Sequence, residues 1–383
     1  MKCCKSMALA SCALLLASAC SVSNNSSSVT ASGLDPAKFV AEIDGKPTAL
    51  YSLVNDRGME VCITNYGGRI VSVMVPDRNG VMNDVVLGFD SIGAYRPEVN
   101  QSDFGASIGR YANRINQGRI VIDGDTVQLP QNNFGHCLHG GPTGWQYKVY
   151  SADQPNDSTL VLTIDSPDGD NNFPGNVRAS VTYTLTSDNA IDIAYEAVTD
   201  RPTVVNMTNH SYFNLNGNPS NPITDNVLMI NADSYTPVDS TFMTTGEIAA
   251  VEGTPMDFRA PKAVGDEIDT DFIQTVNGRG YDHNWVLNTA GSTDEPAARL
   301  MSPLTGIVLE VYTDEPGIQV YTGNFLDGSV TGKGGKTYEK RAAICLETQH
   351  YPDSPNKPEW PSVVLRPGEK YTSHCVFRFD VEK

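Results

Sequence analysis

The chain has 383 residues, of which 40% are hydrophobic, enough to build one large core or two smaller ones. Its 33 glycines and 23 prolines, without any long helical period, favour an all-β chain with many turns. The formal net charge of −18 opposes binding to nucleic acid and to anionic lipid head groups, so neither is expected as a partner. Solubility alone explains this charge, which identifies no particular ligand.

The first 20 residues have the pattern of an export signal, with two early lysines followed by an apolar run that is too short to span a bilayer. Small residues lead up to Cys20, and this resembles a bacterial lipoprotein signal that is cut before Cys20, which is then acylated. The alternative is an ordinary secretory signal cleaved after Ala19. In either case residues 1–19 are a signal peptide, and the lipoprotein interpretation predicts a membrane anchor in the cell envelope.

Residues 20–36 are rich in Ser and Asn and predict a flexible tether, so that residues 37–383 form the domain, with order beginning near Phe39. Among the cysteines of the domain, Cys62 and Cys345 lie in apolar runs and are expected to be buried thiols. No pairing of cysteines follows from their spacing. The chain contains no Cys-x-x-Cys or His-x-x-x-His motif, so no metal site is expected.

Period-two patterns recur along the domain, separated by turn residues such as Asp123-Gly124-Asp125 and Ser187-Asp188-Asn189. Apolar residues alternate with smaller or polar ones in the segments 71–75, 160–164, 177–185, 191–195 and 371–379. The only helix predicted is a short one over residues 266–274. With no internal repeat and no shift in composition after residue 36, the pattern predicts one large antiparallel β-sandwich.

Glu347 ends an apolar run, 342–346, and is followed by a segment with two prolines, Pro352 and Pro355. This pattern predicts a buried strand that runs out into a rigid loop. A carboxylate at such a position is poorly solvated, which is typical of functional sites. The alternative is a buried glutamate that is paired with a structural partner.

Two other stretches are dense in polar side chains next to apolar strands: 206–215, which contains His210, and 109–115, which is followed by His139 in a Leu-His-Gly-Gly motif. A single histidine or arginine is more often structural than catalytic. The combination of histidines in Gly- or Asn-rich contexts with an arginine and a glutamate at a strand end points instead to a site.

The stretch Leu-Glu-Thr-Gln-His-Tyr-Pro-Asp-Ser-Pro-Asn at 346–356 resembles the signature of the aldose 1-epimerases, or galactose mutarotases. Further segments resemble blocks of that family in the family's order, from about residue 40 to 380: 109–115, 138–141, 173–176, 208–215, 253–259, 280–284 and 316–324. The resemblance implies a galactose mutarotase-like supersandwich. It also implies that Glu347 is the catalytic base and His210 the acid, and that the sugar hydroxyls are held by Asn113, Arg114, His139, Asp282 and Gln319.

The chain departs from the family at Trp145-Gln146-Tyr147, where a Phe and then a Lys are usual, and at the loop 134–137, so the rim of the pocket is expected to differ. Mutarotation needs a base at the O1 hydroxyl and an acid at the ring oxygen, which we expect to face the sugar from opposite sides. It needs no metal or cofactor. A neighbouring carboxylate is expected to keep His210 protonated at neutral pH.

Three alternatives remain open at this stage: a glycoside hydrolase or lyase on a similar sandwich, a non-catalytic sugar-binding protein, and an epimerase of phosphorylated hexoses. The preferred aldose cannot be deduced from these motifs. No feature of the sequence sets the oligomeric state, for which a monomer is the simplest expectation.

Overall fold

The computed structural model describes Met1 and residues 29–383, so that the predicted signal peptide and Cys20 lie outside the described part. Among these residues the strands are joined mostly by turns, and the single α-helix is α1 (Ile273–Asn277). No helix in the described ranges is both long and apolar enough to cross a bilayer. The all-β prediction is therefore confirmed.

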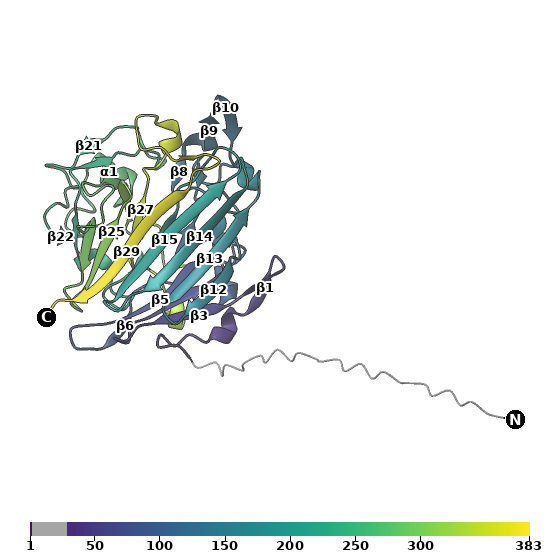
Figure 1. Cartoon of the computed structure of the whole chain (residues 1–383). Helices are drawn as coiled ribbons and strands as arrows, with labels where there is room; N and C mark the ends of the chain where they lie inside the picture. The colour runs from purple at the N-terminus through teal and green to yellow at the C-terminus, as the bar shows by residue number, and fades with distance from the viewer. Residues whose placement is uncertain (2–28) are drawn as a thin grey trace.

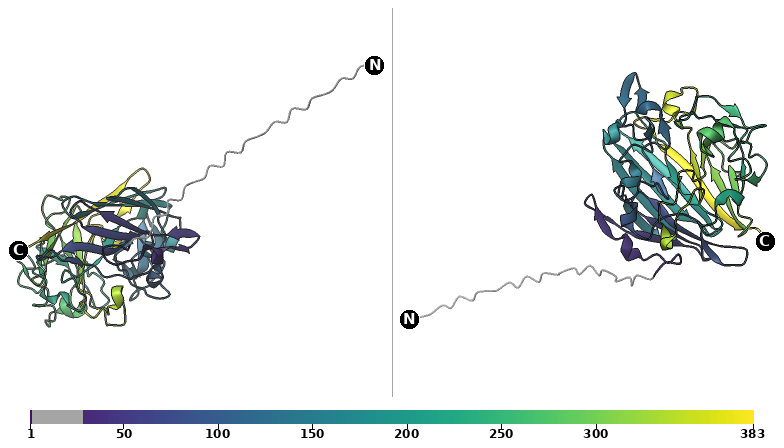
Figure 2. Two further views of the ribbon diagram at one scale, coloured as in Figure 1. Left: turned by 90° about the horizontal axis from the view of Figure 1, so that it is seen from below. Right: turned by 180° about the vertical axis from the view of Figure 1, so that it is seen from behind.

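The first layer is an antiparallel sheet of nine strands, whose long members lie side by side across the molecule (Figure 1). In order across the sheet they are β12 (Ser151–Asn156), β13 (Thr159–Ser166), β14 (Val177–Leu185), β15 (Ala190–Thr199), β29 (Tyr371–Val381), β25 (Ile307–Thr313), β24 (Ala298–Met301), β19 (Val227–Ile230) and β22 (Lys262–Ala263). From behind, β29 in yellow again runs beside the teal strands (Figure 2). The C-terminal strand thus lies in the middle of the sheet.

The second layer is a six-stranded sheet, and a four-stranded sheet stands beside it. The six strands are, in order, β18 (Tyr212–Phe213), β27 (Ile344–Gln349), β26 (Gly317–Tyr321), β23 (Asp282–Val286), β20 (Ser234–Thr236) and β21 (Ala249–Ala250). The four strands are β3 (Leu50–Val54), β4 (Glu60–Thr64), β5 (Arg69–Pro76) and β6 (Met82–Asp84).

Five two-stranded ribbons complete the fold of the described residues. They pair β1 (Ala41–Ile43) with β2 (Lys46–Thr48), β7 (Ala106–Ile108) with β17 (Thr208–His210), β8 (Arg114–Ile115) with β11 (Cys137–Leu138), β9 (Arg119–Ile122) with β10 (Asp125–Gln128), and β16 (Thr203–Val204) with β28 (Val364–Leu365). The turn between β9 and β10 contains Asp123 at φ 53° and Gly124 at φ 90°, the positive values that tight hairpins require.

The hydrophobic core lies between the sheets and joins them into one sandwich. In β14 every second residue is buried and the others are exposed or partly exposed, as the period-two pattern predicted. Phe213 of the six-stranded sheet packs edge to face on Phe377 of the nine-stranded sheet, with ring centroids 5.0 Å apart. Burial of a phenylalanine contributes roughly 1.5–3 kcal/mol, so contacts of this kind hold the layers together.

The packed domain begins earlier than the predicted boundary at residue 37. Leu34 is buried, the Ala31 amide donates to Glu60, and Asp35 caps the 3-10 helix η1 (Pro36–Phe39) through the amide of Ala37. The prediction of a tether up to residue 36 is therefore wrong for residues 31–36. Composition concealed this because a single large apolar residue, Leu34, is enough to fix the segment.

The predicted helix over residues 266–274 is also wrong, since α1 begins only at Ile273. The preceding segment forms turns in which Thr270 donates both its amide and its hydroxyl to the carbonyl of Glu267. Such local bonds compete with the helical ladder. Cys62 and Cys345 are buried free thiols as predicted, and Cys137 and Cys375 are likewise free and buried.

Candidate active site

Three neighbouring strands, β23, β26 and β27, place Asp282, Gln319 and Glu347 close together. In the sheet register Gln319 lies directly opposite Glu347 on one side and opposite Asn284 on the other. Residues two apart in a strand share a face, so Asp282 points the same way as Asn284. The Gln319 Nε2 atom donates to Asp282 Oδ1 at 2.7 Å. The register between these strands therefore places Asp282, Gln319 and Glu347 next to one another on one side of the site.

His210 reaches the same place from another ribbon, because it is the last residue of β17. Its Nε2 atom lies 3.5 Å from Glu347 Oε1, beyond the usual hydrogen-bond length. The imidazole stacks on Tyr212 and meets His139 edge to face, both with ring centroids 5.1 Å apart. The expectation that the two catalytic groups face a sugar from opposite sides is wrong, since they lie side by side.

His139 and Asn113 are held against each other by two hydrogen bonds. The Asn113 amide donates to His139 Nδ1 at 3.1 Å, and the His139 amide donates to the Asn113 carbonyl at 3.0 Å. Both residues have positive φ values, 61° and 50° respectively. An Nδ1 atom that accepts a hydrogen bond places the proton of the neutral ring on Nε2, so His139 presents a donor.

Arg114 lies beside this pair, and its guanidinium is oriented by two groups that the motifs did not identify. Its Nε and Nη2 atoms donate to Asn133 Oδ1 at 3.2 and 3.1 Å. Its charge also lies 5.2 Å from the centroid of the Phe242 ring. Burial lowers the pKa of Arg114, while the negative charges of Asp282 and Glu347 raise it. Asn133 and Phe242 carry no sequence signal that sets them apart.

The loop after β27 is locked next to Arg114 by a buried carboxylate. Asp353 Oδ1 accepts hydrogen bonds from the Asn116 amide at 2.9 Å and from Asn356 Nδ2 at 2.6 Å. The Asp353 amide in turn donates to the Arg114 carbonyl at 2.8 Å. Pro352 and Pro355 lie in this loop, and the hydrogen bonds of Asp353 tie the loop to Asn116 and Arg114.

All seven predicted site residues are buried, with exposed fractions between 2% and 8%. Several of their polar atoms have no hydrogen-bond partner among the described residues, namely Glu347 Oε2, His210 Nδ1 and Gln319 Oε1. Buried polar atoms are normally paired, so an unpaired group of them marks a place where a polar ligand supplies the missing partners.

Burial dominates the ionisation of the central pair. It raises the pKa of Glu347 well above its usual range, and the charges of Asp282 and Asp103 add to this effect. Burial also lowers the pKa of His210 to about 4. This direction is opposite to the expectation that a neighbouring carboxylate raises the pKa of His210, because desolvation is the largest effect on the imidazole.

The segment in which the sequence departs from the family motif contributes one core residue and two residues that line a cavity. Trp145, the first residue of the 3-10 helix η4 (Trp145–Tyr147), is buried against Gly109 and acts as a core residue. Gln146 and Tyr147 line a cavity of about 320 Å³ that also contains His139 and Asp103. Asp103 was not predicted, because it stands alone in a short polar segment.

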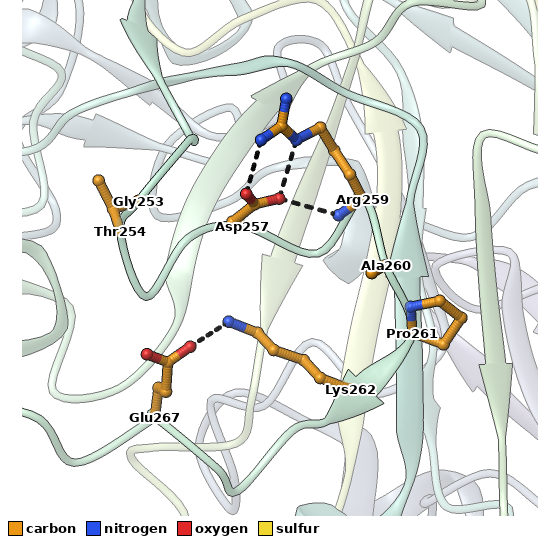
Figure 3. A pocket seen from close by; sticks show the side chains of 8 residues that line it. All are labelled: Gly253, Thr254, Asp257, Arg259, Ala260, Pro261, Lys262 and Glu267. Carbon is orange, nitrogen blue, oxygen red and sulfur yellow. Dashed lines mark hydrogen bonds and ion pairs between the residues drawn. The ribbon is translucent and has the colours of Figure 1, made fainter.

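A more open hollow of about 810 Å³ includes none of the seven residues. In Figure 3 its charges are paired with one another, Arg259 with Asp257 and Lys262 with Glu267. Paired, partly exposed charges of this kind contribute little and leave no group free for a ligand. The buried cluster around Glu347 is therefore the better candidate.

A β-sandwich with a buried carboxylate–imidazole pair among amide, guanidinium and imidazole donors is the arrangement of an acid–base enzyme for a polyhydroxylated substrate. The model of the aldose 1-epimerase family matches residues 49–378. The chain belongs to the aldose 1-epimerase family.

Named relatives agree with this assignment. Human galactose mutarotase is 43% identical over 324 residues, covering 84% of this chain and 92% of that protein. The aldose 1-epimerase of Escherichia coli (strain K12) is 40% identical over 341 residues, covering 88% and 97%. The crystal structure of galactose 1-epimerase from Lactobacillus acidophilus has a TM-score of 0.79 at 30% identity and covers 90% of this chain and 97% of that one.

Proposed function

We propose that this protein interconverts the α and β anomers of free aldoses such as galactose and glucose, with Glu347 and His210 as its acid–base pair. The observation that supports this most is the 3.5 Å separation of His210 Nε2 and Glu347 Oε1 in a buried site with unpaired polar atoms. Both oxygens that exchange protons in mutarotation are bonded to C1. Neighbouring catalytic groups are therefore suited to reach them together.

Ring opening requires one group to take the proton of the O1 hydroxyl while another donates a proton to the ring oxygen. Ring closure on the other face reverses the two roles, so one proton held by the pair suffices for the whole cycle. Burial favours the neutral form of both groups, because it raises the pKa of Glu347 and lowers that of His210. The charge of Arg114 opposes this effect at Glu347, because it lowers the pKa of that carboxyl.

The remaining predicted residues hold the hydroxyl groups of the sugar. His139 offers the Nε2 proton, Arg114 offers its guanidinium, and Asp282 and Gln319 offer acceptors within one hydrogen-bonded unit. The backbone amide of Asn113 orients His139 through a hydrogen bond. The side-chain oxygen of Asn113 accepts a hydrogen bond from the Arg114 amide at 2.9 Å. This set of mixed donors and acceptors suits a neutral polyol.

Polarimetry of freshly dissolved α-anomers, with the spontaneous rate subtracted, tests the proposal. The mature protein should accelerate the approach to anomeric equilibrium. It should release no reducing sugar from oligosaccharides, which separates it from a glycoside hydrolase. A protein that binds aldoses without accelerating mutarotation would instead establish the sugar-binding alternative.

A separate proposal concerns location: Cys20 is acylated, and the protein is a monomer anchored in the cell envelope by that lipid. It rests on the pattern of residues 1–20, with small residues before Cys20. The native protein should partition with membranes, and Cys20→Ser should move it to the soluble fraction. A wild-type protein already soluble in the periplasm would favour the ordinary secretory signal.

A further inference from the structure

Asp103 lines the cavity of about 320 Å³ next to His139, although no motif identified it. One carboxylate oxygen of Asp103 and one ring nitrogen each of His139 and His210 lie within 4.8 Å of one another. The position is held by the backbone, since the Gly105 amide donates to the His210 carbonyl and the Ala106 amide to the Asp103 carbonyl, both at 3.0 Å. The carboxylate is thus placed by the β7–β17 ribbon beside His210.

The Asp103 carboxylate has no hydrogen-bond or ion-pair partner among residues 29–383, and its Oδ1 atom is buried. Arg69 is near enough to lower its pKa, but the guanidinium of Arg69 donates to the carbonyls of Ser102, Phe104 and Gln146 instead. Burial prevails and raises the pKa of Asp103 to about 6. A structural carboxylate would be paired, so this one is free to bind a ligand group.

Asp103 and Glu347 approach His210 in two separate clusters. Asp103 belongs to the cluster with His139, Glu347 to the one with Cys345, and His210 to both. If Glu347 acts at O1 and His210 at the ring oxygen, the sugar group that continues past the ring oxygen is the substituent on C5. The cavity beside His210 on this side is lined by His139, Asp103, Gln146 and Tyr147, and it is the space that such a substituent would enter.

We propose that Asp103 is a specificity-determining residue that accepts a hydrogen bond from the C6 hydroxyl of a neutral hexose and excludes sugars with an anionic C6 group. The inference rests on the proposed function, because the orientation of the sugar comes from the catalytic pair. A carboxylate repels a hexuronate or a hexose 6-phosphate. It also loses its partner when the sugar is a 6-deoxyhexose, which leaves a buried charge unpaired.

The test compares kcat/KM for D-galactose, 6-deoxy-D-galactose and D-galacturonate, which differ only at C6, with spontaneous rates subtracted. Wild-type protein should favour galactose over each of the other two by roughly 10–100-fold. Asp103→Asn keeps an acceptor oxygen but removes the charge, so the ratio of galacturonate to galactose should rise by about tenfold or more. Asp103→Ala should bring galactose down towards 6-deoxygalactose.

Glu98→Gln serves as a matched control, because Glu98 is an exposed carboxylate of the same segment, and its three rates should equal those of the wild type. An unchanged galacturonate ratio in Asp103→Asn overturns the inference. An equal fall for all three sugars also overturns it, since Asp103 would then act through His210. Acceleration of none of the sugars by the wild type overturns the proposed function together with this inference.

Discussion

The molecule contains two pairs in which a histidine lies close to a glutamate, and the two pairs differ in their hydrogen bonding. His350 Nδ1 lies 2.6 Å from Glu315 Oε2, a short charge-assisted contact, and the His350 amide also donates to Asn206. His210 Nε2 and Glu347 Oε1 are 3.5 Å apart, and the other polar atom of each side chain has no partner within the described residues. We call His350–Glu315 the closed pair, because the two side chains contact each other directly. We call His210–Glu347 the open pair, because its unpaired polar atoms are available to a ligand.

The difference shows that a buried His–Glu pair does not by itself define a catalytic site. In the closed pair the protein satisfies the two groups directly, which fixes the loop after β27. In the open pair the protein leaves contacts unmade, which is unfavourable without a ligand and favourable with one.

Removal of either member of the open pair should have the largest effect. Glu347→Gln and His210→Asn should each lower kcat by about 10²–10⁴-fold, because general acid–base catalysis is lost, with only a modest change in sugar affinity. Polarimetry of the folded variants measures this. A folded Glu347→Gln protein with near wild-type turnover would show that the base is assigned wrongly.

The residues that we propose to hold the sugar should affect binding as well as turnover. Arg114→Ala and Asp282→Asn should lower kcat/KM by roughly 10–100-fold, with KM raised, because each removes a charged hydrogen-bonding group from the sugar. Arg366→Ala is a suitable control, since Arg366 pairs with Asp123 on the surface. A fall in kcat with KM unchanged would place Arg114 or Asp282 in the chemical step.

The closed pair should matter for stability rather than for chemistry. Glu315→Gln should lower the free energy of unfolding by about 1–3 kcal/mol, because the short contact to His350 is weakened at a buried position. Urea denaturation measures the loss, and kcat/KM at 25 °C should stay within about twofold of the wild type. Loss of turnover in a stable Glu315→Gln protein would remove the distinction between the two pairs.

The dependence of the rate on pH reports how the open pair holds its proton. Activity needs one proton on the pair, so it should fall on the acid side as His210, with a pKa of about 4, takes up a second proton. It should fall on the basic side as Glu347, whose pKa is raised by burial, loses the proton. The profile of kcat/KM should therefore show an acid limb near pH 4, set by His210, and a basic limb set by the raised pKa of Glu347. An acid limb centred above pH 6 would contradict this assignment.

Chelation should have the smallest effect. His210, Cys345 and Glu347 each place one potential ligand atom within 4.8 Å of the others, but the mechanism uses two of these groups for proton transfer. Activity should be unchanged after exhaustive dialysis against a chelator, as measured by polarimetry. Activity lost on chelation and restored by one divalent ion would refute this prediction.

Much of the fold follows from local patterns. The alternation in 177–185 and 371–379 predicted β14 and β29 because a strand exposes two faces to different surroundings. The helix over 266–274 was predicted wrongly because turn bonds of side chains compete with helix formation in a way that composition does not reveal. Leu34 was missed because its burial depends on distant strands.

Local patterns in the sequence predicted the strands and the residue types of the site, including Glu347, His210 and the residues expected to bind the sugar. The three-dimensional packing showed in addition that Glu347 and His210 lie side by side, that burial raises the pKa of Glu347, and that Asp103 lies near His210. These properties could not be predicted because they depend on cross-strand register and on burial. Both arise from contacts between segments far apart in the chain, which no local pattern encodes.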